Sequence, residues 1–174
     1  MNGAITAVVG LTSLVLTTAL AQAPPREGQA DLPGVPLSYS DTGGRGAPVV
    51  FVHAATGSRR VWEYQLPAFT AAGYRVITYD RRGFGRSTID PAGPQPGIGA
   101  DDLLALVNHL GLDRIHLVGT AAGGIVALDF AVSFPQRLRS LVVANSIGGV
   151  QDEDYLELGR RLGPAPFNAL PPHV

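Results

Sequence analysis

The chain contains no cysteine, and only one methionine and one tryptophan, among its 174 residues. Without cysteine it has no disulfide framework, no thiolate nucleophile and no cysteine-ligated metal site. Its 13 basic and 14 acidic side chains leave a formal charge of −1 and form no basic run, so nothing in the sequence favours nucleic-acid binding. Motifs that hold nucleotides and closely spaced metal ligands are also missing. We therefore expect no nucleic-acid partner, no cofactor and no metal.

Hydrophobic residues are plentiful, at 45% of the chain, which is enough for a packed core and excludes a disordered acidic tail. A length of 174 residues fits one compact domain. The 22 glycines and 14 prolines follow no repeat period and are interpreted as turns between secondary-structure elements.

The first 23 residues have the pattern of a secretory signal peptide. Residues 4–20 are uncharged and mostly apolar, two overlapping Ala-x-Ala cleavage patterns end at Ala21 and Ala23, and a polar, proline-rich stretch follows. No lysine or arginine precedes the apolar run, and a run of about 17 apolar residues would just permit an uncleaved membrane anchor instead. We favour export, to the periplasm or outside the cell, with membrane anchoring as the alternative.

The remaining sequence alternates between strand and helix patterns. We predict an exposed strand at 37–42, buried strands at 48–53, 74–79, 114–119 and 140–145, and helices at 58–72, 100–110 and 123–134. Pro67 is expected to kink the first helix or divide it in two. Strands alternating with helices of this length indicate βαβ units, so the predicted fold class is α/β with a mostly parallel sheet.

Ligands of such sheets bind beyond the carboxyl ends of the strands, so the strand-to-helix junctions are the candidate functional segments. The junction after residue 119 reads Gly119-Thr120-Ala121-Ala122-Gly123. Gly119 and Gly123 indicate that strand and helix approach closely, leaving the central residue at the tip in a strained backbone conformation. This segment resembles the nucleophile elbow of the α/β-hydrolases.

Two further segments extend the resemblance along nearly the whole chain after residue 23. Residues 53–57 look like the family's oxyanion loop, and residues 80–87 look like its Asp-x-Arg-Gly-x-Gly-x-Ser turn, although the latter also fits a packing turn with no chemical role. The resemblance is to esterases, lactonases and epoxide hydrolases. It implies a doubly wound sheet, with 24–146 forming the N-terminal part of the core and 147–174 beginning a cap region.

The chain departs from the family pattern at the catalytic residues. Ala121 occupies the position of the usual serine, and Thr120 lies one residue out of register, so the elbow has no nucleophile. The family's acid and histidine follow later strands that are absent from this sequence. His53 belongs to the oxyanion loop and no other histidine makes a convincing general base. The sequence thus predicts a hydrolase scaffold without hydrolytic activity.

A carbonyl-binding pocket does not depend on the missing side chains. The resemblance assigns the oxyanion donors to the amides of Ala55 and Ala122, beside His53. Ala54, Trp62 and Thr120 are candidate pocket residues, although a helix packed on a sheet needs an aromatic such as Trp62 in any case. The scaffold suits small carboxylic esters or lactones, and the alternative is an exported binding protein that uses the same pocket without turnover.

Three explanations of Ala121 remain open at this point. They are an engineered change from serine, a natural pseudo-enzyme, and a natural non-hydrolytic activity on the same scaffold; we favour the two natural explanations together over the first. The last predicted strand, 140–145, would leave an unpaired sheet edge, and such edges pair with other chains. We therefore expect a complementing C-terminal half or self-association through this edge, besides a small-molecule carbonyl ligand.

Overall fold

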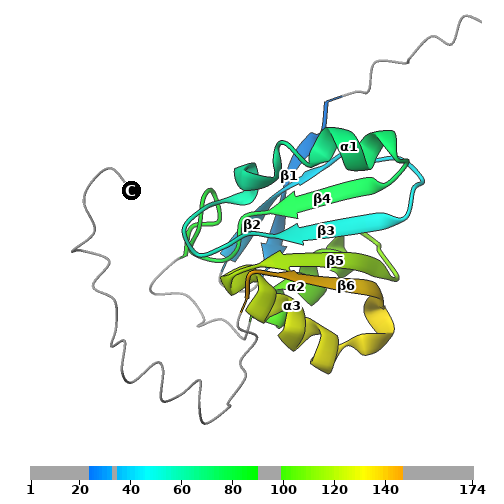
Figure 1. The fold of residues 1–174 in the computed structure, drawn as a ribbon. Coiled ribbons are helices and arrows are strands. Elements are labelled where there is room, and N and C mark those ends of the chain that lie inside the picture. The colour runs from blue at the N-terminus through cyan, green and yellow to red at the C-terminus, as the bar shows by residue number, and fades with distance from the viewer. Residues whose placement is uncertain (1–23, 33–34, 90–98, 147–174) are drawn as a thin grey trace, which may run out of the picture.

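The computed structural model describes residues 24–32, 35–89 and 99–146. They form a six-stranded sheet with helices on both faces (Figure 1), in the strand order β1-β2-β4-β3-β5-β6. The strands are β1 (Arg26–Leu32), β2 (Val35–Asp41), β3 (Pro48–Val52), β4 (Arg75–Tyr79), β5 (Ile115–Thr120) and β6 (Leu138–Ala144). The helices are α1 (Leu66–Ala71), α2 (Gly99–His109) and α3 (Ala122–Ser133), with short 3-10 turns η1 (Arg59–Trp62) and η2 (Pro135–Arg137). The predicted α/β fold class is confirmed.

The sheet is mostly parallel, as predicted. Strands β4, β3, β5 and β6 run parallel to one another, whereas β1 pairs antiparallel with β2 and β2 pairs antiparallel with β4. The carboxyl ends of the four parallel strands therefore meet at one edge of the sheet. This is the edge at which ligands of open α/β sheets bind.

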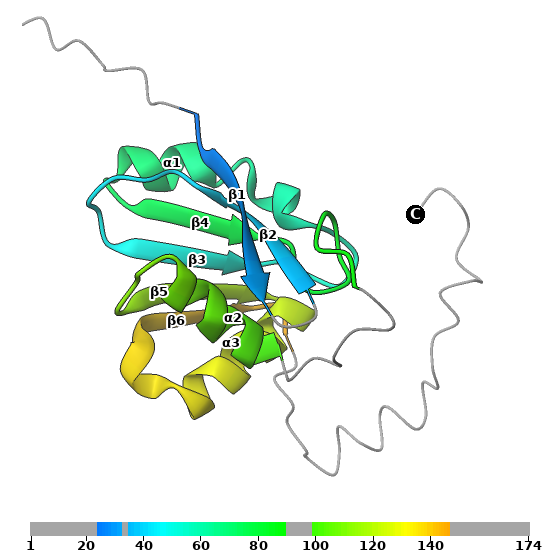
Figure 2. The same cartoon turned by 180° about the vertical axis from the view of Figure 1, so that it is seen from behind.

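Alternating side chains of the central strands enter two separate hydrophobic clusters. Val50, Val52 and Ile77 pack with residues of α2 and α3 on one face. Val49, Phe51 and Val76 pack on the other face, where η1 and α1 lie. Figure 2 shows α2 and α3 on the face opposite α1. Burial on both faces explains why the sequence of β3 is continuously apolar rather than alternating.

The N-terminal edge of the sheet differs from the prediction. The sequence analysis identified no strand before residue 37 and placed an exposed strand at 37–42. Instead, β1 covers the outer edge of β2 along its whole length, and Leu37 is fully buried. Strand β1 was missed because it is largely polar, with only Ala30 and Leu32 packed into or against the core, so it contains no apolar run.

The helical segment at 58–72 is divided in two, as expected, but Pro67 does not cause a kink. Residues 63–65 separate η1 from α1, and Pro67 lies in the first turn of α1. A proline is well tolerated there because the N–H groups of the first turn have no partner within the helix. Pro67 therefore helps to begin α1.

Some predicted segments lie outside the described residues. These are the signal-peptide-like segment 1–23 and the predicted cap region 147–174. Among the residues that are described, no helix is long and apolar enough to cross a membrane.

Candidate functional site

Ala121 lies at the tip of a sharp turn between β5 and α3 and has a strained backbone. Its φ of 48° and ψ of −119° are unusual for a residue with a Cβ atom, and such a conformation costs about 1–3 kcal/mol. The turn is fixed on both sides, because the Ala121 N–H donates to the Ala144 carbonyl at 3.1 Å and the Ala121 carbonyl accepts from the Gly124 N–H at 2.9 Å. The strain expected at this position is therefore present, and a methyl group stands at the tip.

Two glycines allow the elbow to pack tightly, as predicted. A Cβ atom on Gly119 would lie 2.4 Å from the Gly123 carbonyl oxygen, and one on Gly123 would lie 2.3 Å from the Val52 carbonyl oxygen. Atoms cannot approach so closely, so both positions require glycine. The first turn of α3 consequently lies directly against the ends of β5 and β3, beside the loop that follows β3.

His53 begins that loop and is fully buried. Its Nε2 accepts a hydrogen bond from the Arg81 N–H at 2.9 Å, so the ring proton is on Nδ1, which donates to the Ala54 carbonyl at 2.6 Å. Burial lowers the pKa of His53, and the nearby Arg81 lowers it further, which favours the neutral ring. Both ring nitrogens are occupied. His53 therefore anchors the loop to the turn after β4 and is not free to act as a base.

The amides assigned to the oxyanion hole have no acceptor in the described part of the chain. Ala55 is exposed in the loop after β3, and Ala122 is the first residue of α3. Neither N–H makes a hydrogen bond within the described residues. N–H groups in the first turn of a helix carry partial positive charge and attract negative charge. The Ala122 amide can therefore donate to an oxygen atom bound at this edge, and the Ala55 amide of the exposed loop is available as a second donor.

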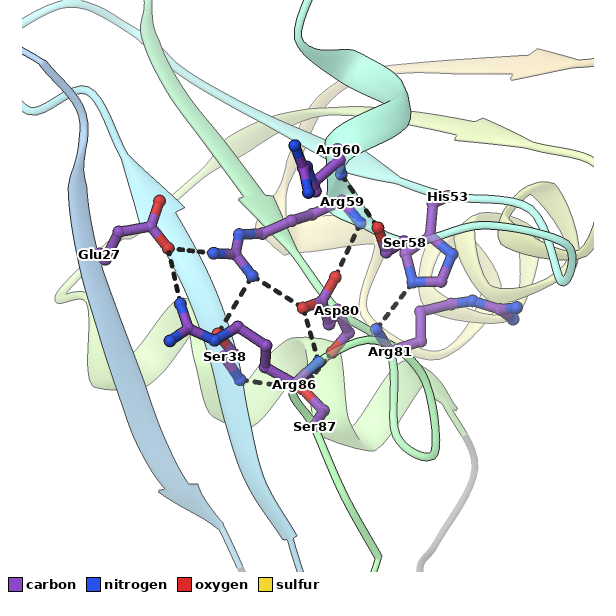
Figure 3. Close-up of polar contacts among 10 residues, drawn as sticks. All are labelled: Glu27, Ser38, His53, Ser58, Arg59, Arg60, Asp80, Arg81, Arg86 and Ser87. Carbon is purple, nitrogen blue, oxygen red and sulfur yellow. Dashed lines mark hydrogen bonds and ion pairs between the residues drawn. The ribbon is translucent and has the colours of Figure 1, made fainter.

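The turn after β4 is a closed network of polar groups, drawn in Figure 3. The Asp80 carboxylate is buried and accepts from the Arg59 N–H at 2.8 Å, the Arg59 guanidinium at 2.7 Å and the Arg86 N–H at 3.0 Å. Ser87 Oγ donates to the Asp80 carbonyl at 2.7 Å and accepts from the Ser38 N–H at 2.9 Å. These bonds support the interpretation of residues 80–87 as a packing turn.

This network also holds the far end of the oxyanion loop. Because Asp80 binds the backbone N–H of Arg59, the loop is anchored by His53 at its start and by Asp80 at its end. The Arg59 guanidinium further contacts Glu27 of β1 and the hydroxyl of Ser38. The sequence analysis did not identify Arg59, since a pairing across 21 residues leaves no local pattern.

A cavity of about 550 Å³ lies beside this network and not at the elbow. It is lined by residues of β1, β2, η1 and the 80–87 turn, among them Glu27, Arg59, Arg60, Asp80 and Arg86. Its charged groups are largely engaged with one another, because Asp80 and Glu27 both contact Arg59. We therefore interpret it as a surface recess over a structural network.

The remaining predicted pocket residues have different surroundings. Trp62 packs against Phe51, with ring centroids 4.8 Å apart, in the hydrophobic cluster beneath η1 and α1. Those are the contacts of a core residue. Thr120 is the half-buried last residue of β5 and pairs with Ala144 of β6. No group of three or more histidine and acidic side chains suited to a metal ion occurs in the described part of the chain.

Comparisons with known proteins identify relatives of several activities. The chain is 37% identical over 111 residues to a 2-hydroxy-6-oxononadienedioate/2-hydroxy-6-oxononatrienedioate hydrolase of Paraburkholderia phymatum, covering 62% of this chain and 38% of that protein. The solved N-acyl homoserine lactone degrading enzyme Est816 shares 32% identity and a TM-score of 0.60, over 68% of this chain and 45% of that one. The epoxide hydrolase CorEH shares 32% identity and a TM-score of 0.65, over 72% of this chain and 44% of that one.

These matches cover only part of the length of each relative. The chain spans about two fifths of the length of the curated relatives it matches. On this chain, by contrast, the model of the alpha/beta hydrolase fold matches residues 47–165, which include the oxyanion loop, the 80–87 turn and the elbow. The strained elbow, the close-packed glycines and this match agree, and the chain belongs to the alpha/beta hydrolase fold family.

Proposed function

We propose that the carboxyl edge of the sheet binds the carbonyl oxygen of a small carboxylic ester or lactone, and that this chain does not hydrolyse the ligand. The observation that carries the proposal is the backbone of Ala121. The elbow keeps the strained conformation that presents a tip residue to a ligand, but the tip is a methyl group. The Ala55 and Ala122 amides supply the donors for the carbonyl oxygen.

The absence of hydrolysis follows from the side chains at this edge. Covalent catalysis needs a nucleophile and a neighbouring base that activates it. Ala121 offers no lone pair, and both nitrogens of His53 are engaged in hydrogen bonds. Est816 degrades N-acyl homoserine lactones and has a similar fold, which supports a lactone as the ligand class. Because residues 1–23 resemble a signal peptide, we propose an exported pseudo-enzyme that binds such a ligand.

The test is an NMR titration of the ¹⁵N-labelled full chain with γ-butyrolactone, with hydrolysis followed in the same samples. We expect saturable shifts at the Ala55 and Ala122 amides and no release of the hydroxy acid. Ala121→Gly keeps both donors and should bind as the unchanged chain does. Ala121→Leu places a larger side chain at the tip and should abolish the shifts.

Two results would contradict the proposal. Catalytic turnover of the lactone by the unchanged chain would show that a nucleophile other than residue 121 is active. Unperturbed Ala55 and Ala122 amides at saturating lactone would show that this edge binds no carbonyl. Ala121→Ser provides a further check: no base is positioned beside the tip among the described residues, so we expect the added hydroxyl to give no esterase activity.

We also propose that the free edge of β6 accepts a strand from a complementing C-terminal hydrolase half. In the described part of the chain β6 pairs only with β5, and Val142 on its surface is 50% exposed. Unpaired strand edges pair readily with other chains. Without that half we expect concentration-dependent self-association in light scattering, reduced by Val142→Lys. A monodisperse monomer with a sharp, cooperative thermal transition would refute this.

We propose export of the mature chain on the basis of residues 1–23. The expected result is a product in the periplasm or medium whose intact mass shows removal of the leader, beginning at Pro24. Replacing apolar residues of the 4–20 run by charged ones should retain the full-length chain in the cytoplasm. An uncleaved product in the membrane fraction would favour the anchored alternative.

A further inference from the structure

Several arginine side chains among the described residues are paired with a carboxylate. Three of them are held at short range by a buried or part-buried acid: Arg59 by Asp80 at 2.7 Å, Arg75 by Asp41 at 2.6 Å and Arg82 by Asp102 at 2.5 Å. Each of these pairs joins segments that are distant in sequence. The neighbouring Arg81 is not held in this way.

Arg81 is half-buried and has no carboxylate partner in the described residues. Its Nε and Nη2 atoms are enclosed by the protein and make no hydrogen bond. The guanidinium lies 4.5 Å from the centre of the Phe84 ring, and its backbone N–H is bound to His53. In Figure 3 its side chain extends away from the Asp80 network, on the side of His53. Burial accordingly lowers the pKa of Arg81. An anion beside this half-buried cation would offset part of its desolvation cost.

Arg81 also lines a cavity of about 220 Å³ at the carboxyl end of β4. The other lining residues are Tyr79, Arg82, Gly99, Asp102 and Val126. Tyr79 ends β4 and Val126 lies on α3, so the cavity opens beside the ligand-binding edge of the sheet. Arg82 and Asp102 neutralise each other. Among the described lining residues, the charge that remains is the positive charge of Arg81, against partly apolar walls.

We propose that this cavity binds a small monocarboxylate, with the Arg81 guanidinium as its cationic partner. A planar guanidinium matches the geometry of a carboxylate. A single negative charge balances the one unmatched cation, whereas doubly charged phosphate would also face the Asp102 carboxylate in the same cavity. The site involves neither Ala121 nor the Ala55 and Ala122 amides, so it goes beyond the carbonyl site proposed above and does not depend on it.

The test is an NMR titration of the full chain with sodium acetate, at an ionic strength held constant with sodium chloride. We expect saturable shifts at the Arg81 guanidinium and at the Gly99 amide, with weaker effects of phosphate. Arg81→Gln should weaken acetate binding by about 10- to 100-fold, the usual contribution of a hydrogen bond to a charged group. Acetate should also raise the melting temperature of the unchanged chain but not that of Arg81→Gln.

Two variants make the result specific. Arg81→Lys keeps the charge without the planar fork, so it should fold and should bind acetate less tightly than the unchanged chain but more tightly than Arg81→Gln. Arg86→Gln removes a cation from the same turn whose side chain is 73% exposed, and it should bind as the unchanged chain does.

Equal acetate binding by Arg81→Gln and the unchanged chain, or a parallel loss in Arg86→Gln, would overturn the proposal. Shifts confined to the Ala55 and Ala122 amides would also overturn it, and would place acetate at the elbow instead. Loss of lactone binding with acetate binding retained would reject the proposed function alone.

Discussion

The turn after β4 and the elbow after β5 lie at the same edge of the sheet but are built differently. Both contain a residue with positive φ, Gly85 at 53° in the turn and Ala121 at 48° in the elbow. In the turn that residue is glycine, which adopts the conformation freely, and the Asp80 carboxylate beside it is fully bonded. In the elbow the strain falls on alanine, and the nearby Ala122 amide has no acceptor among the described residues. The turn is thus held by side-chain hydrogen bonds, whereas the elbow leaves a backbone donor without a partner in this part of the chain.

The largest expected effect comes from the turn. Asp80→Asn removes the charge that pairs with Arg59 and should lower the free energy of unfolding by about 3–5 kcal/mol, as is usual when a buried ion pair loses one partner. Urea denaturation of both proteins measures this. Asp101→Asn, an exposed acid in the first turn of α2, should cost less than about 1 kcal/mol. If the two variants lose similar amounts of free energy of unfolding, the Asp80 network does not make the turn especially stable.

The packing of the elbow should be the next most sensitive feature. In Gly123→Ala the new Cβ would meet the backbone carbonyl of Val52, which cannot move aside, and the cost should be about 1–3 kcal/mol. In Gly57→Ala the nearest atom belongs to the side chain of Val61, which is 46% exposed and can shift. Thermal unfolding should therefore rank Gly57→Ala as the milder change. The reverse order would contradict close contact between α3 and β3.

Replacing Ala121 by glycine can relieve the backbone strain at this position without removing a polar side chain. Ala121→Gly should raise the free energy of unfolding by about 1 kcal/mol, because the relieved strain of about 1–3 kcal/mol exceeds the conformational entropy that glycine costs, about 0.5–1 kcal/mol. Asn145→Gly is the matched control. Asn145 has a φ of 49°, but asparagine tolerates this region, so little change is expected. Destabilisation by Ala121→Gly would show that the elbow is unstrained in solution.

The smallest effect should be a pH dependence that originates at His53, between the two regions. Burial lowers the pKa of His53 in the folded chain below its ordinary value of 6.5. The unfolded chain therefore binds the proton first as the pH falls, so stability should decrease below about pH 6.5 and level off once the folded-state pKa is passed. His53→Gln should remove this dependence, and His109→Gln should leave it in place. Urea denaturation between pH 5 and 8 would test both, and an unaltered pH profile in His53→Gln would refute the assignment.

The sequence predicted the features that depend on local chemistry. Continuous apolar runs indicated the buried parallel strands, and the glycine spacing around residue 121 indicated the elbow and its strain. The polar strand β1 was not predicted, because it is stabilised by pairing with β2 and its own sequence has no hydrophobic strand pattern. The burial of β2 was missed for the same reason, since β1 is the neighbour that covers it.

The polar partners of the site could not be predicted from local patterns. Two adjacent arginines follow β4, yet Arg82 pairs with Asp102 and Arg81 has no carboxylate within the described residues. Adjacent positions in a turn point in different directions, and the acids that they meet come from other elements. Likewise, Arg59 joins Asp80, Glu27 and Ser38 only because the strand order brings β1, β2 and β4 together.

By itself, then, the sequence determined the α/β class, the strand-to-helix junctions, the glycines that permit close packing and the alanine at the tip of the elbow. These are properties of single residues and of short-range periodicity, which act on the chain locally. Only the tertiary structure decided which arginine pairs with a carboxylate. It also placed His53 where both ring nitrogens hold the loop after β3, and Asp80 where its carboxylate binds the far end of that loop. Those outcomes depend on contacts between residues 20 to 50 positions apart, and such contacts exist only once the sheet order has formed.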